Sequence, residues 1–140
     1  MPLILFLDDE RRRIATYIEE MEDNDFSVEY KRDVDDALLF LADNINAVKL
    51  LILDLMMPPG KSFTLADTED GLRTGVSVYE RVREMSQSLP VIIFTNVTEE
   101  TVTRRFGEEE HCWFCKKVDY MPPALVAKIR SVLEGPPTIG

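Results

Sequence analysis

Short runs rich in apolar residues recur along this chain and are separated by stretches with helical periodicity. The clearest runs are Leu3–Leu7, Val48–Leu53 and residues 91–94, and weaker ones lie at residues 26–30 and 112–115. Apolar runs without regular polar alternation are typical of parallel strands that are covered on both faces of a sheet. The chain is therefore expected to build a central parallel sheet.

The stretches between these runs have the periodicity of amphipathic helices. Three stripes follow the i, i+3, i+4 pattern, and their members are Ile14, Tyr17, Ile18 and Met21; Val34, Ala37, Leu38, Leu41 and Ile45; and Val76, Tyr79 and Val82. Asp33 and Thr98 are predicted to cap two helices, and Pro122 and Pro123 to open the last one. Five strand–helix units with short connections predict an α/β fold with a doubly wound five-stranded parallel sheet.

Length and charge limit the possible functions. The chain has 140 residues, which suit one domain, here expected over residues 1–134 with a flexible tail at 135–140 and no attached output domain. Its formal net charge of −10 disfavours binding to nucleic acid or to an anionic membrane. The longest uninterrupted apolar run has five residues, far short of the roughly 20 that a membrane span needs. We expect a cytoplasmic protein.

Polar residues follow four of the predicted strands at the point where each run ends. Asp8, Asp9 and Glu10 follow the first run, Asp54 the third, Thr95 the fourth, and Lys116 and Lys117 the fifth. The carboxyl ends of parallel strands share one edge of the sheet, where ligands usually bind. We therefore expect three carboxylates, a hydroxyl and an ammonium group to meet there.

This set of groups suits one kind of chemistry. Clustered carboxylates repel one another unless a cation neutralises them, and Mg²⁺ is bound by one or two carboxylates with waters and phosphate oxygens. A carboxylate beside such a metal is a competent nucleophile, while Lys and Thr could hold phosphoryl oxygens. The sequence therefore suggests phosphoryl transfer to an aspartate.

The same residues resemble the motifs of response-regulator receiver domains of two-component signalling. The resemblance rests on ILFLDDE at 4–10, LILDLMMP at 51–58, VIIFTN at 91–96 and Lys117. It implies a chemotaxis-regulator-like, flavodoxin-like (βα)5 fold. It also implies site roles: Asp54 as phosphoacceptor, Asp9 as a direct Mg²⁺ ligand, Asp8 as a ligand acting mainly through water, and the Met56 carbonyl as a further ligand. Thr95 and Lys117 would contact the phosphoryl group, and Thr95 and Phe114 would change conformation when the domain switches. Lys116 and Lys117 are expected to be neighbours in the fifth strand with side chains on opposite faces, and the spacing from Thr95 favours Lys117 as the site residue.

The resemblance further implies partners. A histidine kinase or histidine phosphotransfer protein would supply the phosphoryl group, and a downstream protein would bind the switched surface of a monomer or phosphorylation-dependent dimer. The chain would catalyse this transfer and its own slow dephosphorylation, as a signalling module rather than a metabolic enzyme. The alternative is a phosphorylation-independent pseudo-receiver that acts only as a protein-interaction module.

Four features depart from the family pattern. Val118 follows Lys117 where a proline is usual, Asn96 replaces a small residue, and about a dozen residues are inserted near 59–73 beside the expected site. The insertion is either a tolerated surface loop or a partner-specific or gating loop. Cys112 and Cys115 form a CxxC pattern after His111, but an extended strand points residues i and i+3 to opposite faces. We expect two buried structural cysteines, with redox or metal binding as the alternatives.

Overall fold

The computed structural model describes residues 1–71, 73–97 and 99–135 of the chain. Five parallel strands form one sheet in the order β2-β1-β3-β4-β5. Their bounds are Leu3–Leu7 for β1, Ser27–Lys31 for β2, Val48–Leu53 for β3, Val91–Thr95 for β4 and Cys112–Lys116 for β5. The predicted doubly wound parallel sheet is confirmed.

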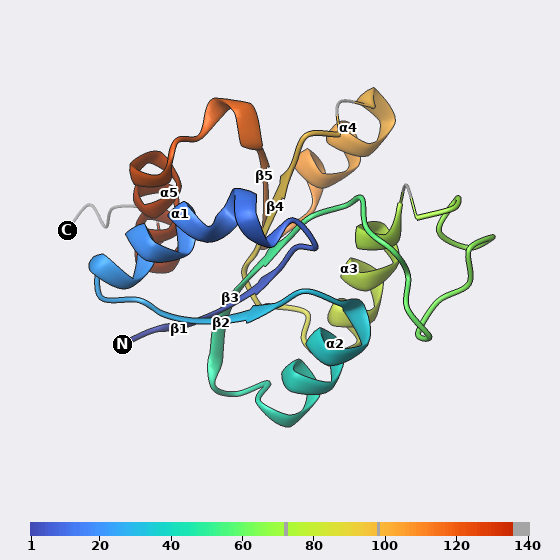
Figure 1. Ribbon diagram of the computed structural model, residues 1–140, viewed down its shortest axis with the longest axis horizontal. Coiled ribbons are helices and arrows are strands. Elements are labelled where there is room, and N and C mark those ends of the chain that lie inside the picture. Colours follow the sequence, from blue (N-terminus) through green and yellow to red (C-terminus); the bar gives the residue numbers. More distant parts are fainter. Residues whose placement is uncertain (72, 98, 136–140) are drawn as a thin grey trace.

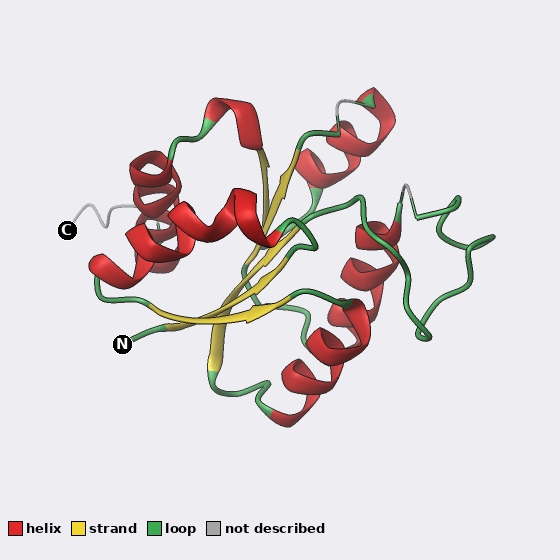
Figure 2. Cartoon of the chain, in the orientation of Figure 1, coloured by secondary structure: helices red, strands yellow, loops and turns green. Residues whose placement is uncertain are grey.

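The helices cover both faces of this sheet (Figures 1 and 2). Helices α1 and α5 pack on one face, and α2, α3 and α4 pack on the other. Their bounds are Arg11–Asp23 for α1, Val34–Asp43 for α2, Thr74–Met85 for α3, Glu100–Glu108 for α4 and Pro122–Glu134 for α5. A 3₁₀ helix, η1, spans Lys117–Asp119 between β5 and α5. Within the described residues, no helix is both long enough and apolar enough to cross a bilayer.

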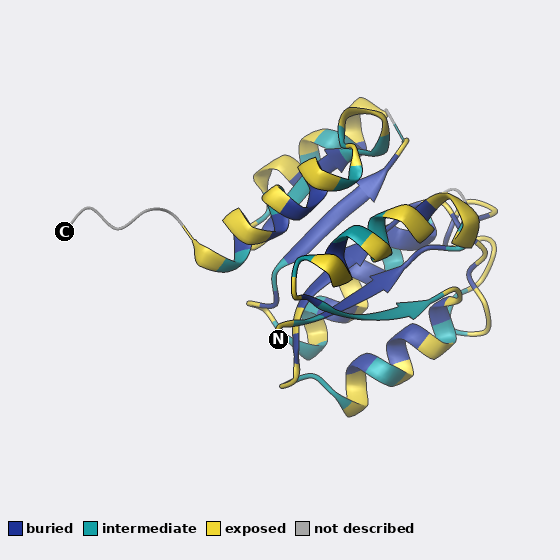
Figure 3. Cartoon of the chain, turned by 60° about the vertical axis from the view of Figure 1, so that its left-hand side comes forward, coloured by how far each residue is buried: buried dark blue, intermediate teal, exposed yellow. Residues whose placement is uncertain are grey.

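The core has two layers because alternate strand residues face opposite sides of the sheet. Leu5 and Leu7 of β1 pack towards α2, α3 and α4, whereas Ile4 and Phe6 pack towards α1 and α5. Strands β1, β3 and β4 are largely buried, β2 is half-buried along its whole length, and the outer helix surfaces are exposed (Figure 3). Both cysteines are free and buried, as expected, with Cys112 in the first layer and Cys115 in the second.

Most element boundaries match the sequence, with three corrections. Strand β2 lies one residue later than expected. Strand β5 ends at Lys116, so Lys117 is not a strand residue but the first residue of η1. Helix α4 has Glu99 at its N-cap, and the predicted cap Thr98 lies outside the described residues. Residues 136–140 of the predicted tail lie outside them as well. The predicted cap of α2 is confirmed, because the Asp36 amide donates to Asp33 Oδ1 at 2.9 Å.

The insertion between β3 and α3 is a folded loop at the edge of the domain, beside α3 in Figure 1. The carboxylate of Asp35, in the first turn of α2, accepts hydrogen bonds from the amides of Lys61 and Ser62 and from the Ser62 hydroxyl. Phe63 packs against the core. At the base, the Thr74 hydroxyl donates to the Met57 carbonyl. The loop is thus tied at both its middle and its base.

Candidate functional site

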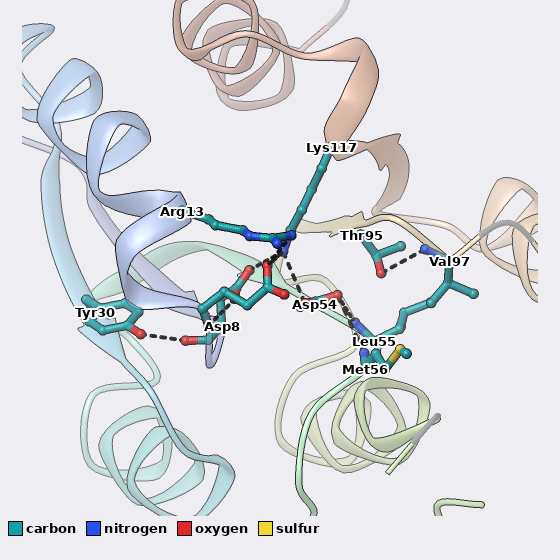
Figure 4. A network of polar contacts seen from close by, with 10 residues as sticks. Asp8, Arg13, Tyr30, Asp54, Leu55, Met56, Thr95, Val97 and Lys117 are labelled. Atoms are coloured by element: carbon teal, nitrogen blue, oxygen red, sulfur yellow. Dashed lines mark hydrogen bonds and ion pairs between the residues drawn. The ribbon is translucent and has the colours of Figure 1, made fainter.

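The expected site residues come together at the carboxyl edge of the sheet (Figure 4). Asp8 follows β1, Asp54 follows β3, Thr95 ends β4 and Lys117 follows β5. Figure 4 shows the Lys117 side chain pointing from η1 towards the two aspartates. Residues more than 100 positions apart in the sequence therefore share one small volume, because parallel strands place all their carboxyl ends on the same side.

Lys117 is the central cation of this cluster. Its Nζ atom lies 2.7 Å from Asp8 Oδ2, 3.2 Å from Asp54 Oδ2 and 3.5 Å from Glu10 Oε2. Burial alone lowers the pKa of Lys117, but the carboxylates of Asp54 and Asp8 outweigh that effect and raise it overall. Lys117 therefore remains charged at neutral pH.

Asp8 is held rigidly at the end of β1. The Glu10 amide donates to Asp8 Oδ1 at 2.8 Å, and the Tyr30 hydroxyl donates to the Asp8 carbonyl at 2.6 Å. The residue is fully buried, and this burial raises the pKa of its carboxyl group even though Lys117 and the Glu10 amide oppose the shift. Asp8 is thus a buried carboxyl group that depends on Lys117 for its charge balance.

Asp54 has its two oxygens in different surroundings. Oδ1 accepts a 2.7 Å hydrogen bond from the Leu55 amide, whereas Oδ2 accepts from Lys117 at 3.2 Å. Only 5% of the residue is exposed. Helix α3 closes in behind it, since a Cβ atom at Gly75 would overlap the Asp54 carbonyl oxygen. This glycine allows the helix and the strand end to approach.

The three aspartates are arranged closely enough to bind a metal ion. One carboxylate oxygen each from Asp8, Asp9 and Asp54 lies within 4.8 Å of the other two. Burial raises the pKa of Asp9, and the nearby charge of Asp54 raises it further. The cluster holds more carboxyl groups than ammonium groups, so a divalent cation would offset part of its negative charge. Because all the donor atoms are oxygens and the site borders a cavity open to water, Mg²⁺ fits this donor set.

A cavity of about 890 Å³ opens over the cluster. Asp9, Asp54, Thr95 and Lys117 line it, and so does Met56, which is 48% exposed. Thr95 itself is buried, and its Oγ1 accepts a 3.3 Å hydrogen bond from the Val97 amide. The Thr95 hydroxyl thus borders the same space as the carboxylate of Asp54.

Phe114 is the one expected site residue that lies apart. It is half-buried against the core layer of α2, α3 and α4, and it lines a separate cavity with Glu100, Thr103 and Lys116. The structure therefore brings Asp8, Asp9, Asp54, Met56, Thr95 and Lys117 together and leaves Phe114 on the α4 side.

Sequence reasoning did not single out Tyr30, Thr74 or Asp35. The parallel register pairs Phe6 with Tyr30, so the Tyr30 side chain reaches the end of β1. That position could have been found once β1 and β2 were paired. Thr74 and Asp35 hold the insertion in place by hydrogen bonds, and no sequence pattern predicts the path of that loop. The Lys117–Val118 peptide is trans, as are the other peptide bonds of the described residues.

No protein-family model matches the chain, and no curated protein matches it in sequence. Solved structures do match it. The non-phosphorylated HemR receiver domain from Leptospira biflexa is 20% identical, with a TM-score of 0.78 over 99% of this chain and 98% of that one. The Vibrio cholerae chemotaxis protein CheY4 is 20% identical, with a TM-score of 0.74 over 95% and 99%. The receiver domain of the Francisella response regulator 1452 is 19% identical, with a TM-score of 0.72 over 96% and 98%.

These matches define the fold of the chain. The five-stranded parallel sheet with alternating helices is a flavodoxin-like α/β fold. Within that class, it is the fold of response-regulator receiver domains, as the sequence motifs led us to expect.

Proposed function

We propose that the chain is a receiver domain that accepts a phosphoryl group on Asp54 in a Mg²⁺-dependent reaction. The observation that carries the proposal is the position of Lys117, whose Nζ bridges Asp8 and Asp54 at 2.7 and 3.2 Å. Asp9 lies in the same acidic cluster. A nucleophilic carboxylate, a cation for the phosphoryl oxygens and a metal-ligand set thus occupy one site.

The chemistry follows from these positions. An Asp54 oxygen attacks the phosphorus of a phosphohistidine, a P–O bond forms, the P–N bond breaks and the donor imidazole takes up a proton. The Leu55 amide fixes the orientation of the Asp54 carboxylate through Oδ1. Lys117 exchanges its contact with Asp54 for one with the phosphoryl oxygens, and the Thr95 hydroxyl donates to another of these oxygens.

Asp8, Asp9, Asp54 and the Met56 carbonyl are the residues that would hold Mg²⁺. When bound, the ion supplies positive charge that offsets repulsion between the carboxylates and the phosphoryl oxygens. We propose that Asp9 binds directly and Asp8 mainly through water. Asp8 is fully buried and already bonded to the Glu10 amide, whereas Asp9 borders the open cavity.

The proposed partners follow from this role. A histidine kinase or histidine phosphotransfer protein in the cytoplasm would supply the phosphoryl group. On phosphorylation, Thr95 would move towards the new phosphoryl group and Phe114 would then change its position. These movements would alter the surface near α4 to which a downstream protein binds. The chain would act as a monomer or as a phosphorylation-dependent dimer. Phe114 and the residues of α4 line one cavity, so a shift of this ring changes that surface.

The test is phosphorylation by acetyl phosphate in Mg²⁺, followed by intact mass spectrometry. We expect one acid-stable, base-labile phosphoryl group on the wild-type chain and none on Asp54→Asn. Asp43→Asn, at the C-terminal end of α2, is the control and should be labelled like the wild type. Equal labelling of Asp54→Asn would refute the assignment. An unlabelled wild-type chain would instead favour the phosphorylation-independent pseudo-receiver.

A further inference from the structure

The cavity over Asp54 is far larger than its proposed reaction requires. A phosphoryl group and a partly hydrated Mg²⁺ displace roughly the volume of six waters, about 180 Å³ at about 30 Å³ per water. The cavity measures about 890 Å³. The site therefore has room for a further group beside the phosphoryl group and the metal.

The additional space has an apolar wall that the insertion helps to build. The apolar residues that line the cavity are Met56, Met57, Pro58, Pro59, Leu65 and Val97. Leu65 and Met56 are exposed, at 58% and 48%. Exposed apolar side chains that line a cavity are available to contact a ligand.

The insertion presents Leu65 from a folded turn. The Asp70 amide donates to the Leu65 carbonyl at 2.8 Å, and the buried Thr68 hydroxyl donates to the Thr64 carbonyl at 2.9 Å. At its base, the Met57 amide donates to the Gly71 carbonyl at 3.1 Å, which joins the insertion to the end of β3. The apolar wall is therefore attached to the segment that carries Asp54.

The same cavity has an acidic rim. Glu10, Asp70 and Glu99 line it together with the apolar residues. These carboxylates would repel a second negative charge on a bound phosphodonor, while Lys117 and a metal ion attract the phosphoryl end. The lining thus favours an apolar, uncharged group beside the phosphoryl group.

We infer that this site prefers phosphodonors whose leaving group is apolar and larger than an acetyl group, with aromatic acyl phosphates as the chemical class. The inference rests on the proposed phosphorylation of Asp54. An Asp54 oxygen attacks phosphorus, the bond between phosphorus and the acyl oxygen breaks, and the acid leaves as its carboxylate. No further reactant is needed. Leu65 and its neighbours contact the hydrocarbon part of the donor.

The experiment compares benzoyl phosphate with acetyl phosphate as donors to the full chain in Mg²⁺. The measured quantity is the ratio of the two initial labelling rates, because a ratio compared between variants cancels the different intrinsic reactivities of the donors. The test variant is Leu65→Ser. The control is Leu39→Ser, which removes an equally large exposed side chain from α2, where Leu39 is 64% exposed.

We expect Leu65→Ser to lower the benzoyl-to-acetyl ratio about fivefold, because roughly 40 Å² of apolar contact at about 25 cal/mol per Å² corresponds to that factor. Leu39→Ser should keep the wild-type ratio. An unchanged ratio in Leu65→Ser would overturn the inference while leaving phosphorylation of Asp54 intact. Failure of both donors to label the wild-type chain would overturn the proposed function, and the inference with it.

Binding gives a second measurement that does not depend on turnover. Benzylphosphonate and methylphosphonate are unreactive probes that share the phosphonate but differ in apolar size. In Mg²⁺, benzylphosphonate should shift the methyl resonances of Leu65 and Val97 and bind more weakly to Leu65→Ser. Methylphosphonate should leave those methyl groups unshifted. Equal binding of both probes to both chains would also overturn the inference.

Discussion

The Nζ atom of Lys117 lies 2.7 Å from Oδ2 of Asp8, whose side chain is fully shielded from solvent. The lysine side chain is only 11% exposed, so this is a buried ion pair. Removing one member of such a pair leaves the other charge without compensation, which costs far more than the pair contributes in net stability. The lysine is therefore needed for the stability of the metal-free site as well as for its proposed chemistry.

Lys117→Met should lower the free energy of unfolding by about 3 kcal/mol in a chelating buffer, because it leaves Asp8 and Asp54 without their cation. Urea denaturation measures this. Lys116→Met is the control, since Lys116 ends β5 and lines the separate cavity around Phe114. The control should change stability by less than about 1 kcal/mol. An equal loss in both variants would mean that the ion pair is not what stabilises this edge.

Measurements of Mg²⁺ affinity should distinguish the roles of Asp8 and Asp9. Asp9→Asn should weaken Mg²⁺ binding about tenfold more than Asp8→Asn, because a direct ligand loses more affinity than a residue that acts through water. Isothermal titration calorimetry with the unphosphorylated chain measures both affinities. Glu19→Gln, in the middle of α1, is the control for a change of charge alone. Similar losses in the two aspartate variants would show that their roles are wrongly assigned.

The sequence predicted the cluster because its members lie where apolar runs end. Asp8, Asp54 and Thr95 needed only the rule that parallel strands end on the same edge. The choice of Lys117 over Lys116 rested on spacing and on an assumed strand. That assumption was wrong, since the strand ends at Lys116 and Lys117 lies in a 3₁₀ turn. This 3₁₀ turn follows directly after β5, and no sequence pattern in that segment predicted it.

The insertion shows a second limit of local reasoning. Its position near residues 59–73 was expected from the departure from the family pattern, but its path was not. That path depends on Asp35, which lies more than 20 residues earlier and binds Lys61 and Ser62. An aspartate in the first turn of a helix is favourable by itself, so nothing in the sequence marked Asp35 as an anchor.

Asp35→Ala should release the insertion without unfolding the domain. Hydrogen exchange of the Ser62 amide should accelerate at least about tenfold, because this amide loses its acceptor. The core amides of β3 should keep their wild-type protection. Asp36→Ala is the matched control, since Asp36 lies in the same helical turn but is exposed and does not accept a hydrogen bond from the insertion in the described residues. Unchanged exchange in Asp35→Ala would show that other contacts hold the loop.

The hydrogen bonds that tie the insertion to Asp35 should depend on pH. The Ser62 hydroxyl, with the amides of Lys61 and Ser62, holds the pKa of Asp35 below its ordinary value of 3.8. A carboxyl group whose pKa is lower in the folded protein contributes stability above the unfolded pKa and loses it as pH falls through the folded pKa. Protection of the Ser62 amide, relative to an unstructured peptide, should therefore persist down to pH 4 and fall below it. Loss of protection already near pH 6 would contradict this anchor.

The two cysteines should be unreactive in the folded chain. Burial raises the pKa of Cys112 to about 12 from an ordinary value of 9.0, so its thiolate fraction at pH 8 is about a thousandfold lower than for a free thiol. Burial also raises the pKa of Cys115. A thiol reagent should react slowly with both residues in the native state and rapidly in urea. Rapid native reaction, or stoichiometric zinc in the purified protein, would overturn the structural role.

Two glycine substitutions should test the close packing behind Asp54. Gly75→Ala should destabilise the chain by about 2 kcal/mol, because its Cβ would overlap the Asp54 carbonyl and force α3 away from the strand end. Gly107→Ala should instead stabilise it by about 0.5 kcal/mol, since Gly107 lies in α4 with no atom near the new methyl group. Thermal and urea denaturation measure both effects. Labelling by acetyl phosphate should fall in Gly75→Ala and remain in Gly107→Ala, because only the first change moves the Asp54 backbone. Equal free energies of unfolding for Gly75→Ala and Gly107→Ala would mean that α3 can move away from the site without loss of stability.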